Sequence, residues 1–291
     1  MSCGSCPSLE DCDPGTRASF ASKNLYTWCT NCGNYGIFGA VKNALTQENK
    51  KPHEVLLAFD IGCNSNGADK ISGYRFKGLH GRVIPFACGA SIANQDVPVL
   101  AFAGDGATLG EGISHFVHAV RTNYNVTFIL HNNYNYGLTT GQASPATPDG
   151  IPMKVSPYGT TAEQLNVSQL VMSLKPSFYA RSYSGHVGHM TNVIRKGMQH
   201  KGFSVVEVMQ ACPTFNKATP HMWYMERAFD ISDIKDYDKT DLEQARRVAN
   251  DLTDKIAIGV LYQREDMPDF MAKQQQRKNE TTNLSSEVSI N

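Results

Sequence analysis

Short apolar segments alternate with amphipathic ones along most of the chain. Continuous apolar runs, typical of strands buried on both faces, occupy residues 54–61, 97–104, 126–130, 178–182, 203–208 and 257–261. Helical spacing of apolar residues, or small residues typical of a close-packed helix, marks residues 36–45, 85–94, 113–121, 165–174, 186–200 and 242–256. The alternation predicts an α/β fold, a mostly parallel sheet with helices on both faces. Ligands bind such sheets at the carboxyl ends of strands, which here are followed by polar residues, cysteines and glycines.

The two ends of the chain differ from this middle part. Residues 1–23 lack apolar periodicity and contain Cys3, Cys6 and Cys12, so we expect an N-terminal arm. Three cysteines on an arm lack a fourth metal ligand, and the pattern gives them no defined role. Residues 271–291 are polar and are predicted to be a disordered tail or a segment that docks on a partner. Residues 24–270 are predicted to form one domain.

Charge and hydropathy narrow the class of protein. Lysine and arginine total 27, and aspartate and glutamate also total 27, so no net positive field favours nucleic acid or an anionic membrane. No apolar run reaches the roughly 18 residues of a membrane span, and the start lacks a signal peptide, so we expect a cytoplasmic protein. In that compartment eight cysteines indicate metal binding or redox chemistry rather than structural disulfides.

Two polar motifs follow neighbouring predicted strands. Gly104-Asp105-Gly106 ends one strand, and 25 residues separate Gly106 from the pair Asn132-Asn133 at the end of the next. Glycines let a diphosphate approach the backbone, while Asp105, Asn133 and the carbonyl of Asn135 offer the oxygen ligands that Mg²⁺ prefers. Two ordinary turns are the alternative, because these residue types also form turns.

Four cysteines lie at strand or helix ends on the same predicted side. Cys29 and Cys32 form a Cys-x-x-Cys pair before a helix, Cys63 follows the first strand, and Cys212 follows the strand at 203–208. Such a set suits a [4Fe–4S] cluster or a structural zinc ion. Zinc sites usually show two close pairs, and only one pair is close here, which favours a cluster.

The Gly-Asp-Gly motif, its gap and the following asparagine resemble the shared motif of thiamine diphosphate (TPP) enzymes. From about Tyr26 to Arg264 the chain resembles the beta subunit of 2-oxoacid:ferredoxin oxidoreductases. The matching segments are WCTNCGNYGI, DIGCNS, LHGR-x-x-P, GDG, HFVHA-x-R-x-N, NNYNYGLTTGQASP and QACPTFN. The resemblance implies a pyrophosphate-type TPP domain with Mg²⁺ on Asp105, Asn133 and Asn135, and one [4Fe–4S] cluster on Cys29, Cys32, Cys63 and Cys212. It also implies cofactor contacts from Gly62, Cys63, His80, Gly104, Asp105, Gly106, Asn133, Leu138 and Thr139.

Other residues are ambiguous in the sequence. The resemblance implies catalytic roles for His80 and Thr139, although a solvent-facing loop histidine and a plain glycine-bounded loop are the alternatives. His115 and His118 share one helix face, where structural hydrogen bonding is the expectation. Cys88 lies among small residues and is predicted to be a buried small apolar side chain.

The resemblance also bears on substrate and partners. It implies oxidative decarboxylation of a 2-oxo acid to acyl-coenzyme A, with electrons passed through the cluster to ferredoxin. Thr140 stands where many relatives that take 2-oxoglutarate carry a lysine, which favours pyruvate, because threonine cannot pair a distal carboxylate. The chain is too short for a second, pyrimidine-binding domain, so an alpha subunit is expected to supply the activating glutamate in an (αβ)₂ assembly. The alternatives are a non-redox TPP decarboxylase, an electron-transfer subunit without TPP, and a zinc-stabilised non-catalytic module.

Overall fold

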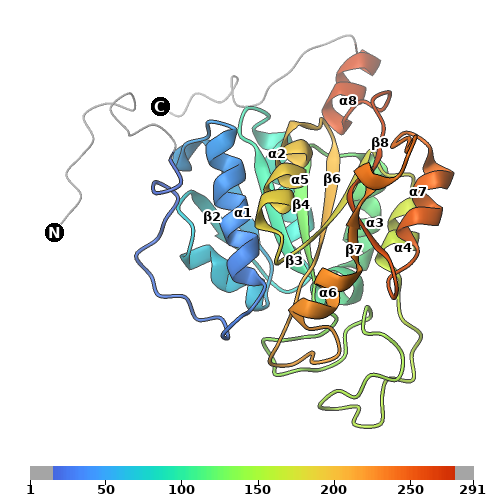
Figure 1. Cartoon of the computed structure of the whole chain (residues 1–291). Coiled ribbons are helices and arrows are strands. Elements are labelled where there is room, and N and C mark those ends of the chain that lie inside the picture. The colour runs from blue at the N-terminus through green and yellow to red at the C-terminus, as the bar shows by residue number, and fades with distance from the viewer. Residues whose placement is uncertain (1–15, 279–291) are drawn as a thin grey trace.

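The computed structural model describes residues 16–278, and a central sheet organises them (Figure 1). Its strand order is β2-β1-β3-β4-β6-β5-β8-β7, and every pair is parallel except β5 with β8. The strands are β1 (Leu56–Phe59), β2 (Tyr74–Lys77), β3 (Val99–Gly104), β4 (Val126–Asn132), β5 (Phe178–Tyr183), β6 (Phe203–Met209), β7 (Ala228–Asp230) and β8 (Ile256–Gln263). The predicted α/β class with a mostly parallel sheet is therefore confirmed.

Helices cover both faces of this sheet. They are α1 (Asn34–Gln47), α2 (Val83–Ala93), α3 (Ile113–Thr122), α4 (Val167–Ser173), α5 (Val187–Gln199), α6 (His221–Arg227), α7 (Leu242–Ala249) and α8 (Phe270–Lys278). Helices α1 and α5 pack side by side on one face, and α2, α3, α4 and α7 lie on the other (Figure 1). None of the described helices has the length and apolar character that crossing a bilayer requires.

Alternate residues of the central strands serve the two faces. On β3, Leu100 and Phe102 join the core under α1 and α5, whereas Ala101 and Ala103 join the core under α2 and α3. All these side chains are buried, which explains why the strand is a continuous apolar run rather than an alternating one. The two cores hold the sheet rigid, so the loops at its carboxyl edge stand on a fixed base.

Four elements have no counterpart in the sequence prediction. Strand β2 has the sequence YRFK and is largely exposed at the sheet edge, and β7 has three residues, so neither carries the apolar run of a buried strand. Helix α6 is also short. Helix α8 occupies residues predicted as tail, so the prediction of disorder is wrong for residues 271–278, and residues 279–291 lie outside the described part.

Two predicted boundaries are also wrong. Helix α7 ends at Ala249 instead of residue 256, because the Asp251 carboxylate accepts the N–H groups of residues 253–255 and closes a turn. At the N-terminus, the predicted arm is already docked at Phe20, which is fully buried in the core under α1, and Ala21 bridges to Ile71. Cys3, Cys6 and Cys12 lie outside the described residues.

Candidate functional site

A cavity of about 320 Å³ lies at the carboxyl ends of β1, β3, β4 and β6. Its wall is formed by residues at the ends of those strands, in the loops that follow them and in the loop after β2. They are Ile61, Gly62, Cys63, Asn64, His80, Gly104, Asp105, Gly106, Ala107, Glu111, His131, Asn133, Asn135, Tyr136, Gly137, Leu138, Thr139 and Gln210. Every residue predicted from sequence to contact the cofactor is among them. Parallel strands bring these segments together, because their carboxyl ends share one edge of the sheet.

Asp105 is the buried acid of this cavity. Its Oδ2 accepts a hydrogen bond from the Ser144 hydroxyl, and its carboxylate also accepts the backbone N–H of Asn133. Oδ1 is buried and has no partner among the described residues. Burial raises the pKa of Asp105 to about 7. A cation beside Oδ1 would compensate the charge of the carboxylate, so the environment fits a metal ligand.

The chain turns sharply as it leaves β3. Gly106 lies under the ring of Tyr136, and a Cβ atom at Gly106 would sit 2.3 Å from Tyr136 Cε1. The Tyr136 hydroxyl donates to the Gly106 carbonyl at 3.3 Å. A side chain at position 106 would therefore displace Tyr136 from the cavity wall, and glycine keeps the backbone of the Gly-Asp-Gly segment accessible.

The end of β4 places two asparagines in the same cavity. The intervening Tyr134 has φ 61°, which bends the chain as it leaves the strand. Asn133 Oδ1 accepts the backbone N–H of Asn135 at 3.2 Å, and the Asn135 side chain donates back to the Asn133 carbonyl at 2.8 Å. Asn216 donates to the same carbonyl at 3.2 Å. These bonds hold Asn133 and Asn135 beside Asp105 with little conformational freedom.

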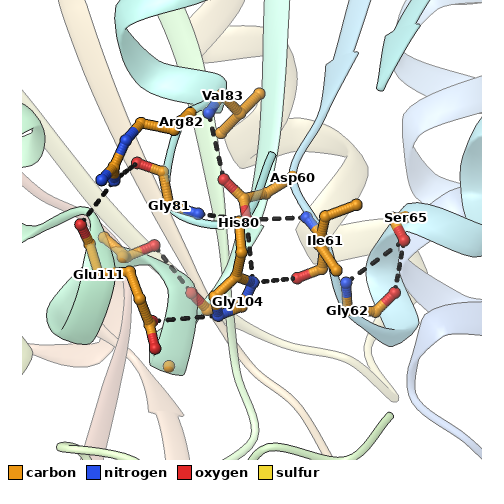
Figure 2. A network of polar contacts seen from close by, with 12 residues as sticks. Asp60, Ile61, Gly62, Ser65, His80, Gly81, Arg82, Val83, Gly104 and Glu111 are labelled. Atoms are coloured by element: carbon orange, nitrogen blue, oxygen red, sulfur yellow. Dashed lines mark hydrogen bonds and ion pairs between the residues drawn. The ribbon is translucent and has the colours of Figure 1, made fainter. Parts of the chain in front are cut away.

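His80 is held on the opposite wall by a polar network (Figure 2). The buried Asp60 carboxylate accepts the N–H groups of Ile61, Gly81 and Val83, at 2.7, 2.9 and 3.1 Å. His80 Nδ1 lies 3.0 Å from the Ile61 carbonyl, and Nε2 lies 3.0 Å from Glu111 Oε2. Both ring nitrogens thus face acceptors, which fixes the ring at the cavity wall. The structure does not place His80 on a free loop.

The four predicted cluster cysteines line a second, smaller cavity of about 150 Å³. Burial, together with the neighbouring cysteines, raises the pKa of Cys32 to about 11 and that of Cys63 to about 12. Thiolates packed together this way need a positive group among them. Within residues 16–278, no three histidine, cysteine, aspartate or glutamate side chains are placed to bind one metal ion together. The sulfurs are distributed around a cavity wall.

The two cavities share a wall. Cys63, Asn133, Gly137, Leu138 and Gln210 line both of them. Gly137 lies close to two of the sulfurs: a Cβ there would lie 3.3 Å from Cys63 Sγ and 3.8 Å from Cys212 Sγ. A single backbone segment therefore separates the space beside Asp105 from the space beside the cysteines.

The loop after Tyr136 holds the remaining predicted residues. Leu138 is half-exposed at the mouth of the cavity, and the Thr139 hydroxyl donates to Gln142 Oε1. Thr140 has φ 78°, and its hydroxyl accepts from Lys154 Nζ at 2.6 Å. An ammonium group therefore stands at position 140, although the residue there is threonine. The preference for pyruvate or a broader 2-oxo acid pocket stays a prediction, and Lys154 is a cation that the argument from Thr140 did not include.

Residues outside the two cavities behave as structural groups. His118 lies within 3.2 Å of the Tyr124 hydroxyl, and neither His118 nor His115 lines the cavities. Cys88 is buried in α2, as predicted, and is remote from the cysteine cavity.

Sequence reasoning missed several lining or neighbouring residues, of which four make polar contacts in the site. Glu111 ends the short π-helical turn η4 (Ala107–Glu111) after Gly-Asp-Gly, and it is the first acidic residue after Asp105. His131 directly precedes the asparagine pair, and Gln210 lies two residues before Cys212, so both adjoin recognised motifs. Ser144 carries no such signal, because only the folding of the loop after β4 brings it to Asp105.

Comparison with known proteins agrees with this site. The family model "Thiamine pyrophosphate enzyme, C-terminal TPP binding domain" matches residues 60–208, the segment that contains the Asp105 cavity except Gln210. A second model, which describes the C-terminal part of the pyruvate ferredoxin oxidoreductase beta chain, matches residues 212–279. The fold and the site thus define a thiamine pyrophosphate enzyme.

Relatives with similar sequences or structures narrow the class of thiamine pyrophosphate enzyme. The chain is 34% identical over 249 residues to the 2-oxoacid:ferredoxin oxidoreductase subunit beta of Saccharolobus solfataricus, covering 82% of each. It is 30% identical over 246 residues to the 2-oxoglutarate synthase subunit KorB of Archaeoglobus fulgidus, covering 84% of this chain and 87% of the relative. A solved 2-oxoglutarate:ferredoxin oxidoreductase from Magnetococcus marinus, with 2-oxoglutarate, coenzyme A and succinyl-CoA bound, superposes with a TM-score of 0.86 at 29% identity, covering 92% of both chains.

The chain belongs to the beta subunits of the 2-oxoacid:ferredoxin oxidoreductases, a family of thiamine pyrophosphate-dependent enzymes. Its relatives are named as beta subunits, which implies an assembly with at least one other kind of chain.

Proposed function

We propose that this chain holds TPP, Mg²⁺ and one [4Fe–4S] cluster, and that with its alpha subunit it oxidises a 2-oxo acid to acyl-coenzyme A. The observation that carries the proposal is the pair of cavities that share the wall at Gly137, one built on Asp105 and the other on four cysteines. When bound, TPP supplies the carbanion that attacks the 2-oxo carbon and the electron sink for decarboxylation.

The magnesium ligands are Asp105, Asn133 and the carbonyl of Asn135. The unpaired and buried Oδ1 of Asp105 supports this assignment, because a carboxylate oxygen in that position is costly without a cation. Gly104 and Gly106 leave the backbone accessible to the diphosphate, and Gly62, with φ 148°, lines the other side of the cavity.

The cluster ligands are Cys29, Cys32, Cys63 and Cys212. Their distribution around a cavity, rather than around a point, supports a multi-atom cluster over a single zinc ion. In the reaction the chain holds this electron acceptor one backbone segment away from the cofactor cavity, and ferredoxin is the external carrier.

His80 and Thr139 act at the substrate side of the cavity. The network through Asp60 and Glu111 orients His80, and the bond to Gln142 orients the Thr139 hydroxyl, so both present fixed polar groups to the reacting acid. The glutamate that activates the aminopyrimidine comes from the alpha subunit, in an (αβ)₂ assembly, and coenzyme A receives the acyl group. The Magnetococcus marinus neighbour, with coenzyme A and succinyl-CoA bound, supports this outcome.

The substrate range includes dicarboxylic 2-oxo acids as well as pyruvate. Lys154 Nζ, bonded to the Thr140 hydroxyl at 2.6 Å, is a cation beside the mouth of a cavity whose own lining has no lysine or arginine. A distal carboxylate has a partner there. The match to a solved enzyme with 2-oxoglutarate bound supports the same range.

The test is anaerobic purification of the chain with its co-expressed alpha partner, followed by assays of iron, sulfide, zinc and TPP on one sample. We expect about four irons and four sulfides per chain together with TPP. The variant Cys63→Ser should lose the iron, and Cys88→Ser, the matched buried control, should keep it. Zinc in place of iron, with no TPP, would overturn the proposal and leave a zinc-stabilised module.

A further inference from the structure

Gln210 connects the two cavities by hydrogen bonds to Cys32 and His131, beside a weaker contact from Cys212 Sγ to Asn135 Oδ1 at 3.9 Å. It is buried, it follows β6, and its side chain lines both cavities. Its backbone N–H donates to the Asn132 carbonyl at 2.8 Å, which fixes the start of the side chain. A Cβ at Gly33 would lie 2.6 Å from Gln210 Cγ, so the chain before α1 packs directly against it. The side chain thus has little room to move.

The orientation of the Gln210 amide follows from its neighbours. Nε2 donates to Cys32 Sγ at 3.7 Å, and Oε1 lies 3.2 Å from His131 Nδ1. His131 Nδ1 also faces Asn34 Oδ1 at 3.0 Å, and both neighbours are acceptors, so Nδ1 carries the proton. A ligand sulfur accepts hydrogen bonds, and reversing the amide would point an oxygen at Cys32. The two contacts therefore select the same orientation.

We propose that Gln210 is a positioning residue that donates a hydrogen bond to the Cys32 ligand sulfur and thereby raises the reduction potential of the cluster. This inference rests on the proposed function, because it requires the cluster on the cysteines. Adding an electron increases the negative charge on the ligand sulfurs, so a donor to Cys32 stabilises the reduced form more than the oxidised form.

The same arrangement defines one acceptor on the cofactor side. With its proton on Nδ1, His131 presents an unprotonated Nε2, which is buried and has no partner among the described residues. His131 lines the cavity beside Asp105. Gln210 and His131 thus fix each other, and the Gln210 amide cannot turn away from Cys32 while His131 stays in place.

The test is a potentiometric titration of the assembled enzyme, in which electron paramagnetic resonance follows the one-electron reduction of the cluster. Gln210→Met keeps a similar volume without a donor, and Gln210→Glu keeps the shape but replaces the donor with an oxygen. We expect the Met variant to shift the reduction equilibrium about tenfold towards the oxidised cluster, which is about 59 mV. The Glu variant should shift it further in the same direction, because it adds a negative charge.

The control is Ser204→Ala, at the start of β6, the strand that precedes Gln210. The Ser204 hydroxyl donates to the Gly197 carbonyl at 2.8 Å, and Ser204 lines neither cavity. It should leave the potential unchanged. If both Gln210 variants contain a full cluster and keep the wild-type reduction potential, the inference on Gln210 is wrong while the proposed function stands. Loss of iron in both, with TPP retained, would also overturn that inference, because Gln210 would then serve assembly of the cluster. A wild-type enzyme without iron would overturn the proposed function as well.

Discussion

A buried ion pair beneath the cofactor cavity makes a quantitative prediction. Arg181 and Glu207 are both fully buried, and Arg181 Nε lies 2.8 Å from Glu207 Oε2. Glu207 also accepts from Tyr179, and from Asn132 Nδ2 at 2.7 Å, while the guanidinium donates to the Ala249 carbonyl at 3.2 Å. Removing one charge leaves the other buried without compensation, which costs about 3–5 kcal/mol of unfolding free energy.

The double variant should be much less damaged than the sum of the single ones. Arg181→Met with Glu207→Gln removes both charges. The glutamine oxygen still accepts from Asn132, and its NH2 group donates to the Tyr179 hydroxyl in place of Arg181 Nη2. The main remaining loss is at the Ala249 carbonyl, about 1–3 kcal/mol for an unsatisfied buried group. The two single changes sum to about 6–10 kcal/mol, so we expect non-additivity of roughly 3 kcal/mol or more.

Urea denaturation of the assembled enzyme, at one fixed protein concentration and followed by circular dichroism, measures these differences. Because Asn132 adjoins the predicted magnesium ligand Asn133, the single variants should also retain less TPP. Strictly additive losses, or an Arg181→Met variant destabilised by less than about 1 kcal/mol, would refute the reasoning that the pair is electrostatically isolated.

Three further outcomes follow from the site. Asp105→Asn should lower TPP affinity roughly tenfold or more, measured by calorimetry with Mg²⁺, and unchanged TPP binding would exclude Asp105 as a ligand. The same variant should stabilise the cofactor-free protein above pH 7. The reason is that the raised pKa of Asp105 makes the folded state lose stability as pH rises through about 7. Lys154→Met should raise the KM for 2-oxoglutarate and leave that for pyruvate unchanged, and equal effects on both would contradict the assigned role. Burial lowers the pKa of His131 to about 3, so its imidazole stays neutral in the folded protein, whereas in the unfolded chain it takes a proton below about pH 6.5. The free energy of unfolding therefore falls as pH drops from 6.5 towards 3, by about 2 kcal/mol at pH 5. His131→Gln should remove that part of the acid sensitivity in denaturation curves recorded from pH 5 to 8, and identical curves would contradict it.

The interior of the fold was predictable from the sequence because burial on both faces leaves a continuous apolar run. Strands β3, β4 and β6 have that signal, and their predicted ends lie within two residues of the observed ones. Edge strands such as β2 lack it, since an exposed strand can carry polar residues on both faces. Boundaries set by side chains, such as the turn closed by Asp251, depend on local hydrogen bonds that periodicity does not record.

The candidate site also has a part that the sequence predicted and a part that it did not. Asp105 and Asn133 directly follow strands, and Cys63 lies four residues after the end of β1, so the topology of a parallel sheet is sufficient to bring them together. Lys154 reaches Thr140 only through the long segment after β4, which has no regular helix or strand between residues 133 and 166 (yellow-green at the bottom of Figure 1). Contacts made by such a segment are not encoded by spacing, so the argument from Thr140 alone could not include Lys154.

The wall at Gly137 bears on which steps can limit the turnover rate of the enzyme once its proposed cofactors are bound. The residues that line both cavities follow β1, β4 and β6 of the same sheet. For the proposed cofactors, this arrangement predicts an electron-transfer distance that is set by the fold and does not wait for a conformational change. Viscous solvents should slow the binding and release of carriers and substrates, while the internal transfer keeps its rate.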